Sequence, residues 1–271
     1  SPESHLKRIR QLVADHCERK TEQIPIEKSL GRTTSADIIA GFDSPRFDNS
    51  QMDGYAVPTA DGGRFEVAAT IPAGASPQPL AGKAAPIMTG AAVPADAAAI
   101  IPVEKATPAE FLAPCETISL PATEPGQFIR VQGCDVAAGS TIIPAGTSIS
   151  AAAVATMASQ SILEVEVFSP ARMLICTGGA EIKAAEVADA QGTATIPDAN
   201  APMLRAMTYG AGIEVVGQVS TNDDPSTLKT SLAAAIENLQ PDVVVTSGGI
   251  SAGKFEVVRQ VLESSRVAAE S

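Results

Sequence analysis

The stretch from Pro241 to Glu263 constrains the fold most, because it joins the pattern of a buried strand to the pattern of a helix. A short β-branched run covers Val243 to Val245. Apolar residues then recur with helical spacing at Phe255, Val258 and Leu262. The order strand, loop, helix predicts one unit of an open α/β sheet.

The loop between this strand and helix, residues 246–253, reads TSGGISAG and has two interpretations. Its glycines suit a tight crossover that needs unusual backbone angles. They also suit a site at the carboxyl end of a strand, where backbone N–H groups and the following helix N-terminus bind an anion. The residues alone leave both interpretations open.

Composition excludes several classes of protein. The 271 residues suffice for one large or two to three small domains, and 45% hydrophobic with 18% charged residues is typical of a globular protein. A charge of −12 with no long basic run argues against a nucleic-acid partner. No apolar stretch approaches the roughly 20 residues of a membrane span. Four dispersed cysteines without a CxxC motif predict reduced thiols and a cytoplasmic location.

Along the rest of the chain, the local composition changes near residue 41 and again near residue 126. Residues 4–20 predict an amphipathic helix, and 24–40 predict a short strand, a turn at Gly31 and then a second helix or strand. Between residues 41 and 126, frequent proline and glycine with short strand-like pieces predict a β-rich domain. Beyond it we expect strands at 141–143, 172–176 and 213–219, and helices at 150–161, 203–209 and 227–239.

Three acidic positions have structural explanations of their own. Asp224 followed by Pro225 suits a helix N-cap with proline in the first helical position. Asp53 lies in a segment rich in Asp, Asn and Ser, which suits turns as well as a site. Asp198 and Asn200 likewise suit either a helix N-cap or a ligand contact.

Four segments, in this order, carry a resemblance to a known family: FDNSQMDGYAV, MTGAAVPADAAAIIPVE, IRVQGCD and VTSGGISAGKFE. The chain resembles the MoeA and gephyrin E-domain family, the molybdopterin molybdenumtransferases, over nearly its whole length. The resemblance implies a multidomain α+β and α/β protein. Its parts would be an elongated arm and dimerisation domain (1–40 plus 130–168), an inserted β-rich domain (41–129) and a Rossmann-like molybdopterin-binding domain (169–271).

The family's later segments Lys-Pro-Gly-Lys-Pro and Gly-Leu-Pro-Gly-Asn-Pro do not occur in this sequence, nor does its C-terminal barrel. The expectation is therefore a molybdopterin-binding domain that lacks its end. The implied reaction inserts molybdate into adenylylated molybdopterin with Mg²⁺, releasing AMP and molybdenum cofactor. The implied partners are a second copy of the chain and an upstream molybdopterin-adenylating protein. The alternatives are a non-catalytic molybdopterin-binding or carrier protein and a structural dimeric scaffold.

The resemblance also implies site residues. The expected catalytic residues are Asp53, Thr89, Asp223 and Glu256, with Asp53 reaching the site of the second subunit. The expected cofactor-binding residues are Thr177, Gly178, Asp198, Asn200, Ser247, Gly248, Gly249, Ser251 and Gly253. The expected Mg²⁺ ligands are Glu181, Asp223, Asp224 and Glu256, since Mg²⁺ prefers carboxylate oxygen.

The sequence departs from the family pattern at several of these positions. Gly179 and Ala180 stand where the family has an acidic pair, and Glu181 comes one place late. Glu256 stands where the family has Asp. Within the pair Asp223 and Asp224, we assign the site role to Asp223 and keep Asp224 as the alternate.

Overall fold

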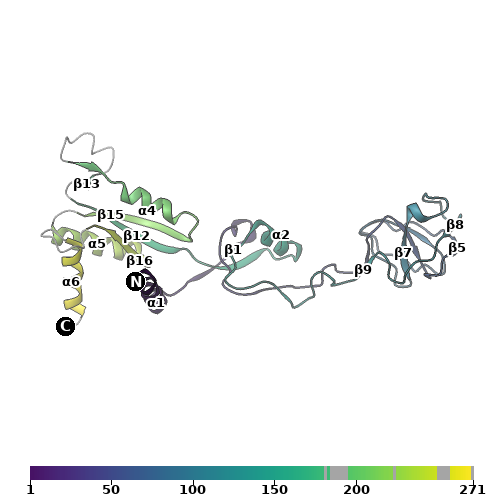
Figure 1. Cartoon of the computed structure of the whole chain (residues 1–271), viewed down its shortest axis with the longest axis horizontal. Coiled ribbons are helices and arrows are strands. Elements are labelled where there is room, and N and C mark those ends of the chain that lie inside the picture. Colours follow the sequence, from purple (N-terminus) through teal and green to yellow (C-terminus); the bar gives the residue numbers. More distant parts are fainter. Residues whose placement is uncertain (180–181, 184–194, 222–223, 249–256, 270–271) are drawn as a thin grey trace. The chain divides into compact units, whose positions relative to one another are not determined.

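The computed structural model describes residues 1–179, 182–183, 195–221, 224–248 and 257–269 (Figure 1). The chain divides into two compact units. The first unit comprises Ser1–Ala36, Gly146–Val154 and Glu164–Ser271, and the second comprises Asp37–Ala145 and Ala155–Leu163. The division into an arm, an inserted domain and a ligand domain remains a prediction. None of the helices in the described ranges has the length and apolarity of a membrane span.

A three-stranded parallel sheet forms the centre of the first unit. Strand β12 (Ala171–Gly178) lies between β15 (Ile213–Thr221) and β16 (Val243–Ser247). Met173 and Ile175 of β12 pack on the side of helix α4 (Asn200–Thr208). Leu174 and Cys176 pack on the opposite side, where helices α5 (Pro225–Leu239) and α6 (Val257–Ala269) lie. Both faces of β12 are therefore buried, as is typical of a strand inside a parallel sheet, and the strand predicted at 172–176 is confirmed.

Helices α4 and α5 each begin where an aspartate side chain accepts the first N–H groups. Asp224 caps α5 by accepting the Ser226 and Thr227 amides at 3.1 and 3.2 Å, as predicted for an Asp before Pro225. The prediction that the preceding helix begins at residue 203 was wrong. Helix α4 begins at Asn200, because Asp198 accepts the amides of Asn200 and Ala201.

The first unit also contains the N-terminal elements. Helix α1 spans Pro2–His16, which confirms a helix there but ends it before residue 20. Strand β1 (Thr21–Pro25) pairs antiparallel with β11 (Glu164–Phe168), and a 3₁₀ turn follows at Ile26–Lys28. A further parallel pair is β13 (Ile182–Lys183) with β14 (Ile196–Pro197). The apolar stripe of α1 remains solvent-exposed, at 44–52% for Leu6, Ile9, Leu12 and Val13.

The second unit is built from short antiparallel strands, as predicted for its β-rich part (Figure 1). Its pairs are β2 (Ile38–Ile39) with β10 (Thr141–Ile143), β3 (Asn49–Ser50) with β9 (Ile129–Arg130), and β5 (Gly63–Glu66) with β8 (Thr117–Leu120). Strand β4 (Gly54–Val57) lies between β6 (Ala85–Ile87) and β7 (Ala99–Pro102), and a 3₁₀ turn follows at Val103–Lys105. Helix α2 spans Ala151–Ser159, within the predicted 150–161, and the division between the two units falls inside it. The segment 24–40 was expected to end in either a helix or a strand. Strand β2 shows that it ends in a strand.

Strand β4 has a hydrophobic cluster on each face. Tyr55 and Val57 belong to one cluster, and Ala56 belongs to the other. All four residues of the strand are buried. A Cβ atom on Gly54 would lie 2.1 Å from the Ile101 carbonyl oxygen of the neighbouring strand. Gly54 therefore permits the close strand approach that places the preceding residue, Asp53, at the strand's entrance.

We predict that Gly54→Ala destabilises the protein by about 3 kcal/mol or more, because the added methyl group meets backbone that cannot rotate away. The matched control is Gly41→Ala, since a Cβ atom there meets nothing within 4 Å and the backbone angle is ordinary. Urea unfolding monitored by circular dichroism measures both variants. Equal stability of the two variants would contradict the close-approach argument.

Candidate functional site

The carboxyl edge of the parallel sheet brings together residues that are far apart in sequence. The register places Thr177 between Ser220 of β15 and Ser247 of β16, and it places Gly178 beside Thr221. Gly178 has φ +131°, and a Cβ atom there would lie 2.9 Å from the Thr221 backbone N and O atoms. This edge therefore requires glycine and leaves its backbone accessible to a ligand.

Gly248 continues the same edge beyond β16. It has φ +94°, and a Cβ atom on it would lie 3.6 Å from the Gly178 carbonyl oxygen. Of the predicted cofactor-binding residues, Thr177, Gly178, Ser247 and Gly248 thus lie together. Gly249, Ser251 and Gly253 lie outside the described residues.

A polar cluster joins Thr177 to the start of helix α4. The Thr177 hydroxyl donates to Asp198 Oδ2 at 2.7 Å, and Thr177 itself is buried. The amides of Asn200 and Ala201 donate to Asp198 Oδ1 at 2.9 and 3.0 Å. Gln218 on β15 donates from Nε2 to Thr177 Oγ1 at 3.2 Å and to Asp198 Oδ2 at 3.3 Å. Both oxygens of Asp198 therefore have protein donors.

These donors keep Asp198 ionised. Partial burial raises the pKa of the carboxyl group, but the Ala201 and Asn200 amides, the Thr177 hydroxyl and Gln218 outweigh it. The net result is a pKa below the ordinary value for Asp. Asp198 performs the predicted capping role, while Asn200 is exposed at the first turn of α4.

In the second unit, Asp53 and Thr89 meet although 36 positions separate them. Asp53 Oδ1 accepts the Thr89 hydroxyl at 2.7 Å and the Thr89 amide at 2.6 Å. These two hydrogen bonds, the hydroxyl first, lower the pKa of Asp53. Both residues are exposed, so an ionised carboxylate faces solvent beside the loop that carries Thr89.

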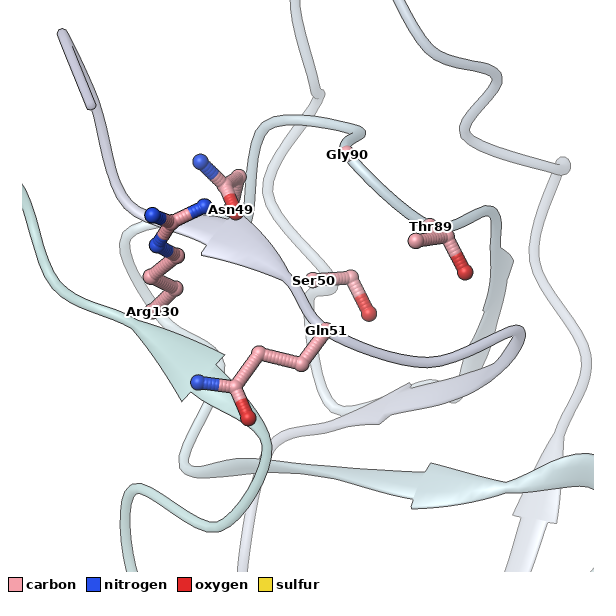
Figure 2. A pocket seen from close by; sticks show the side chains of 6 residues that line it. All are labelled: Asn49, Ser50, Gln51, Thr89, Gly90 and Arg130. Atoms are coloured by element: carbon pink, nitrogen blue, oxygen red, sulfur yellow. The ribbon is translucent and has the colours of Figure 1, made fainter. Parts of the chain in front are cut away.

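A pocket of about 380 Å³ lies next to this pair, lined by Asn49, Ser50, Gln51, Thr89, Gly90 and Arg130. Figure 2 shows the Arg130 guanidinium beside the Asn49 side chain, in keeping with the pairing of Asn49 and Arg130 across β3 and β9. Arg130 also forms an ion pair with Asp135. The Ser50 hydroxyl donates to the Met52 carbonyl at 2.6 Å, which holds the turn before Asp53. The pocket thus presents a cation and amide groups to an anionic ligand.

The expected Mg²⁺ site stays a prediction, because most of its residues lie outside those that the structure describes. Asp224 is the only one of the four expected ligands that the structure describes, and Glu181, Asp223 and Glu256 lie outside those residues. Its carboxylate accepts the Ser226 and Thr227 amides and hydroxyls, and these bonds lower its pKa. Within the described ranges, no three His, Cys, Asp or Glu side chains gather to hold a metal ion.

Three residues of these sites were missed by sequence reasoning. Asn49 and Arg130 lie in segments that carry the resemblance, but only strand pairing shows that they share a pocket. Gln218 joins the cluster at the sheet edge. A polar residue inside the predicted strand 213–219 was the available signal for it.

Comparisons with known proteins assign the chain to a family. Residues 1–161 match the model of the MoeA N-terminal region (domain I and II). Residues 174–267 match a model described as a probable molybdopterin binding domain. The first match covers more than half of the chain, so the chain belongs to the MoeA family.

Individual relatives agree with this membership. Molybdopterin molybdenumtransferase 2 of Mycobacterium tuberculosis is 34% identical over 253 residues, which are 89% of this chain and 60% of that protein. The molybdopterin molybdenumtransferase of Nostoc is 31% identical, covering 91% of this chain and 57% of that protein. A crystal structure of the molybdopterin biosynthesis MoeA protein from Pyrococcus horikosii matches with a TM-score of 0.80 at 27% identity, covering 96% of this chain and 66% of that one. The chain thus spans about 60% of these curated relatives.

We predict that Thr89→Val raises the pKa of Asp53 toward its ordinary value, because the hydroxyl is the larger cause of the lowering and the Thr89 amide remains. Carboxyl ¹³C NMR titration measures this pKa. Stabilisation from a lowered folded pKa is present above the unfolded pKa and is lost as the pH falls through the folded pKa. The difference in Tm between wild type and variant should therefore narrow on acidification.

The control for this titration is Thr59→Val, which removes the same kind of hydrogen bond, from Thr59 Oγ1 to Asp61 Oδ2 at 2.7 Å. This control should leave the pKa of Asp53 unchanged. An unchanged pKa of Asp53 in Thr89→Val would show that the hydroxyl does not stabilise the ionised carboxylate.

Proposed function

We propose that this chain acts in molybdenum cofactor biosynthesis, as a molybdopterin molybdenumtransferase that inserts molybdate into adenylylated molybdopterin and releases AMP. The observation that carries the proposal is the pairing of Asp53 with Thr89 beside the pocket that Arg130 lines, within the part of the chain that matches the MoeA N-terminal region. The relatives from Mycobacterium tuberculosis and Nostoc bear the name of this activity.

Molybdopterin binding is assigned to the carboxyl edge of the sheet in the first unit. Ligands of open α/β sheets bind outside the carboxyl ends of the strands. Here that edge carries Gly178 and Gly248, whose positive φ angles expose backbone, together with the exposed Asn200. The match of residues 174–267 to a molybdopterin binding domain supports the assignment.

The pocket in the second unit suits an oxyanion. The Arg130 guanidinium offers several N–H donors in one plane, which match the spacing of phosphate or molybdate oxygens. Asp53 remains ionised and accepts both the amide and the hydroxyl of Thr89, so its role near an anion is to hold the Thr89 loop in a fixed place beside Arg130. Specificity for oxyanion over carboxylate would follow from this fixed geometry.

Water cleaves the phosphoric anhydride bond of adenylylated molybdopterin, which yields AMP and the phosphate of molybdopterin. The two dithiolene thiols bond to molybdenum and pass their protons to one molybdate oxygen, which leaves as water, so that the oxidation state of molybdenum does not change. The chain's described residues contribute by orienting the anionic reactants and stabilising their charge. Mg²⁺ would be held by Glu181, Asp223 and Glu256, with Asp224 as the alternate to Asp223, and it would offset the negative charge of the two reactants.

A second candidate function is a non-catalytic molybdopterin-binding or carrier protein. The departure from the family pattern at Gly179 and Ala180, where the family has an acidic pair, favours it. The two functions separate in one assay, in which purified protein receives molybdate and adenylylated molybdopterin and AMP release is followed. Binding of molybdopterin without AMP release would identify the carrier.

The proposed function implies a supplier of the substrate, a cellular location and an oligomeric state. A molybdopterin-adenylating protein would supply the substrate. The four cysteines are free thiols, which suits the reducing cytoplasm. The exposed apolar stripe of α1 would pair with a second copy of the chain, since burying it removes several large apolar side chains from water.

We predict that Asp53→Ala abolishes or sharply slows AMP release while the fold is retained, because Asp53 is exposed and contributes no core packing. Release of AMP is measured by chromatography, and folding by circular dichroism. The control is Asp61→Ala, which removes another exposed Asp that is hydrogen-bonded to a Thr hydroxyl. Full turnover by Asp53→Ala would rule out a catalytic role for this carboxylate.

We predict that Leu12→Glu converts the protein from dimer to monomer, because a charge in the α1 stripe must be desolvated at a subunit interface. Analytical ultracentrifugation measures the mass. The control is Lys7→Glu, whose position two residues before Ile9 lies on the opposite side of the helix. A monomeric wild type, or a dimeric Leu12→Glu variant, would exclude pairing through this stripe.

A further inference from the structure

The polar cluster at the sheet edge extends to an arginine that the proposed function does not use. Arg205 lies in the last turn of α4, and its Nη2 atom donates to Gln218 Oε1 at 3.4 Å. The other end of the same amide, Nε2, donates to Thr177 and Asp198. Gln218 therefore connects helix α4 to the carboxyl end of β12.

The chemistry of these partners determines which way the Gln218 amide points. An arginine side chain only donates hydrogen bonds, and an ionised carboxylate only accepts them. The oxygen of the amide must then face Arg205, and its NH₂ group must face Asp198. The reverse orientation would set donor against donor at Arg205 and acceptor against acceptor at Asp198.

The position of the Asp198 carboxylate matters because it sets the geometry of the strand end and of the helix start together. Its Oδ2 atom accepts from Thr177 of β12, and its Oδ1 atom accepts the first amides of α4. The exposed Asn200 follows two residues later. A carboxylate that shifts would move the first turn of α4, and Asn200 with it, relative to Thr177.

We propose that Gln218, held in one amide orientation by Arg205, is a positioning residue that fixes Asp198 and Thr177 at the sheet edge for molybdopterin binding. This inference rests on the proposed function for its ligand. The positioning itself is a property of the four side chains. It can therefore be measured separately from the ligand.

The decisive variant is Gln218→Glu, because glutamate keeps the shape of the side chain and removes its donor. A role in packing alone would survive this change. Gln218→Leu removes the hydrogen bonds without adding charge, so agreement between the two variants separates loss of the donor from repulsion by the new charge. We expect each variant to weaken molybdopterin binding about three- to tenfold, as for loss of hydrogen bonds to a charged group in a partly exposed site.

The matched control is Gln11→Glu in α1, where Gln11 Nε2 donates to Asp15 Oδ1 at 2.8 Å. It removes the same donor from a carboxylate and adds the same charge at a distant position in sequence, and it should leave the affinity within about twofold of wild type. Arg205→Leu should weaken binding in the same direction. Arg205→Lys should keep molybdopterin binding close to that of wild type, because a lysine ammonium group can also donate to Gln218 Oε1.

Two measurements on the whole 271-residue chain decide the matter. Anaerobic isothermal titration calorimetry gives the Kd for molybdopterin, and NMR hydrogen exchange follows the Asn200 and Ala201 amides. Weaker binding and faster exchange in both Gln218 variants would support the inference. Wild-type values of Kd and exchange in Gln218→Glu would overturn it. If wild type fails to bind molybdopterin while exchange still rises in the variants, the ligand assignment is refuted and the positioning role stands.

Discussion

The parallel pairing of β12 with a strand on each side is the constraint on which the first unit depends. Because β12 is central, its backbone groups bond to β15 and β16, and its side chains must be buried on both faces. Met173 and Ile175 pack on the face covered by helix α4, and Leu174 and Cys176 pack on the face covered by helices α5 and α6. The same pairing places Thr177 and Gly178 where three strands end, so packing of the core also creates the candidate ligand edge.

The second unit also contains a strand that is buried on both faces, but in an antiparallel sheet. Strand β4 is covered on both faces, but its neighbours are antiparallel and its entrance is a turn. That turn is held by Ser50 and leads to Asp53, whose carboxylate reaches the loop of Thr89. A rigid strand thereby supports exposed polar groups that a loop alone would leave variable. In both units the candidate site lies at the end of a strand that is buried on both faces.

The sequence predicted those features that depend on neighbouring residues. The run before Thr177, the cap at Asp224 and the helix near residue 150 all have local signals, and the structure bears them out. The start of α4 was placed at residue 203, although Asp198 and Asn200 were considered as its cap. The Asp198 carboxylate accepts the Asn200 and Ala201 amides, so the helix begins at Asn200. The grouping of Asn49 with Arg130, and the place of Gln218 beside Asp198, depend on strand register across long loops. Register of that kind leaves no local pattern.

Both carboxylate oxygens of Asp198 accept hydrogen bonds from the chain, and this changes how the charge of Asp198 can act in a ligand site. An isolated carboxylate at the sheet edge would repel an anionic pterin phosphate and would accept whatever donor came near. Here both oxygens already accept hydrogen bonds from the chain, so the negative charge is spread over fixed N–H and O–H dipoles. Such a carboxylate serves best as a rigid support for its neighbours. Among the described residues, the exposed Asn200 and the backbone at Gly178 and Gly248 remain available to a ligand at this edge. Selectivity at the edge would accordingly come from backbone shape and amide donors more than from charge.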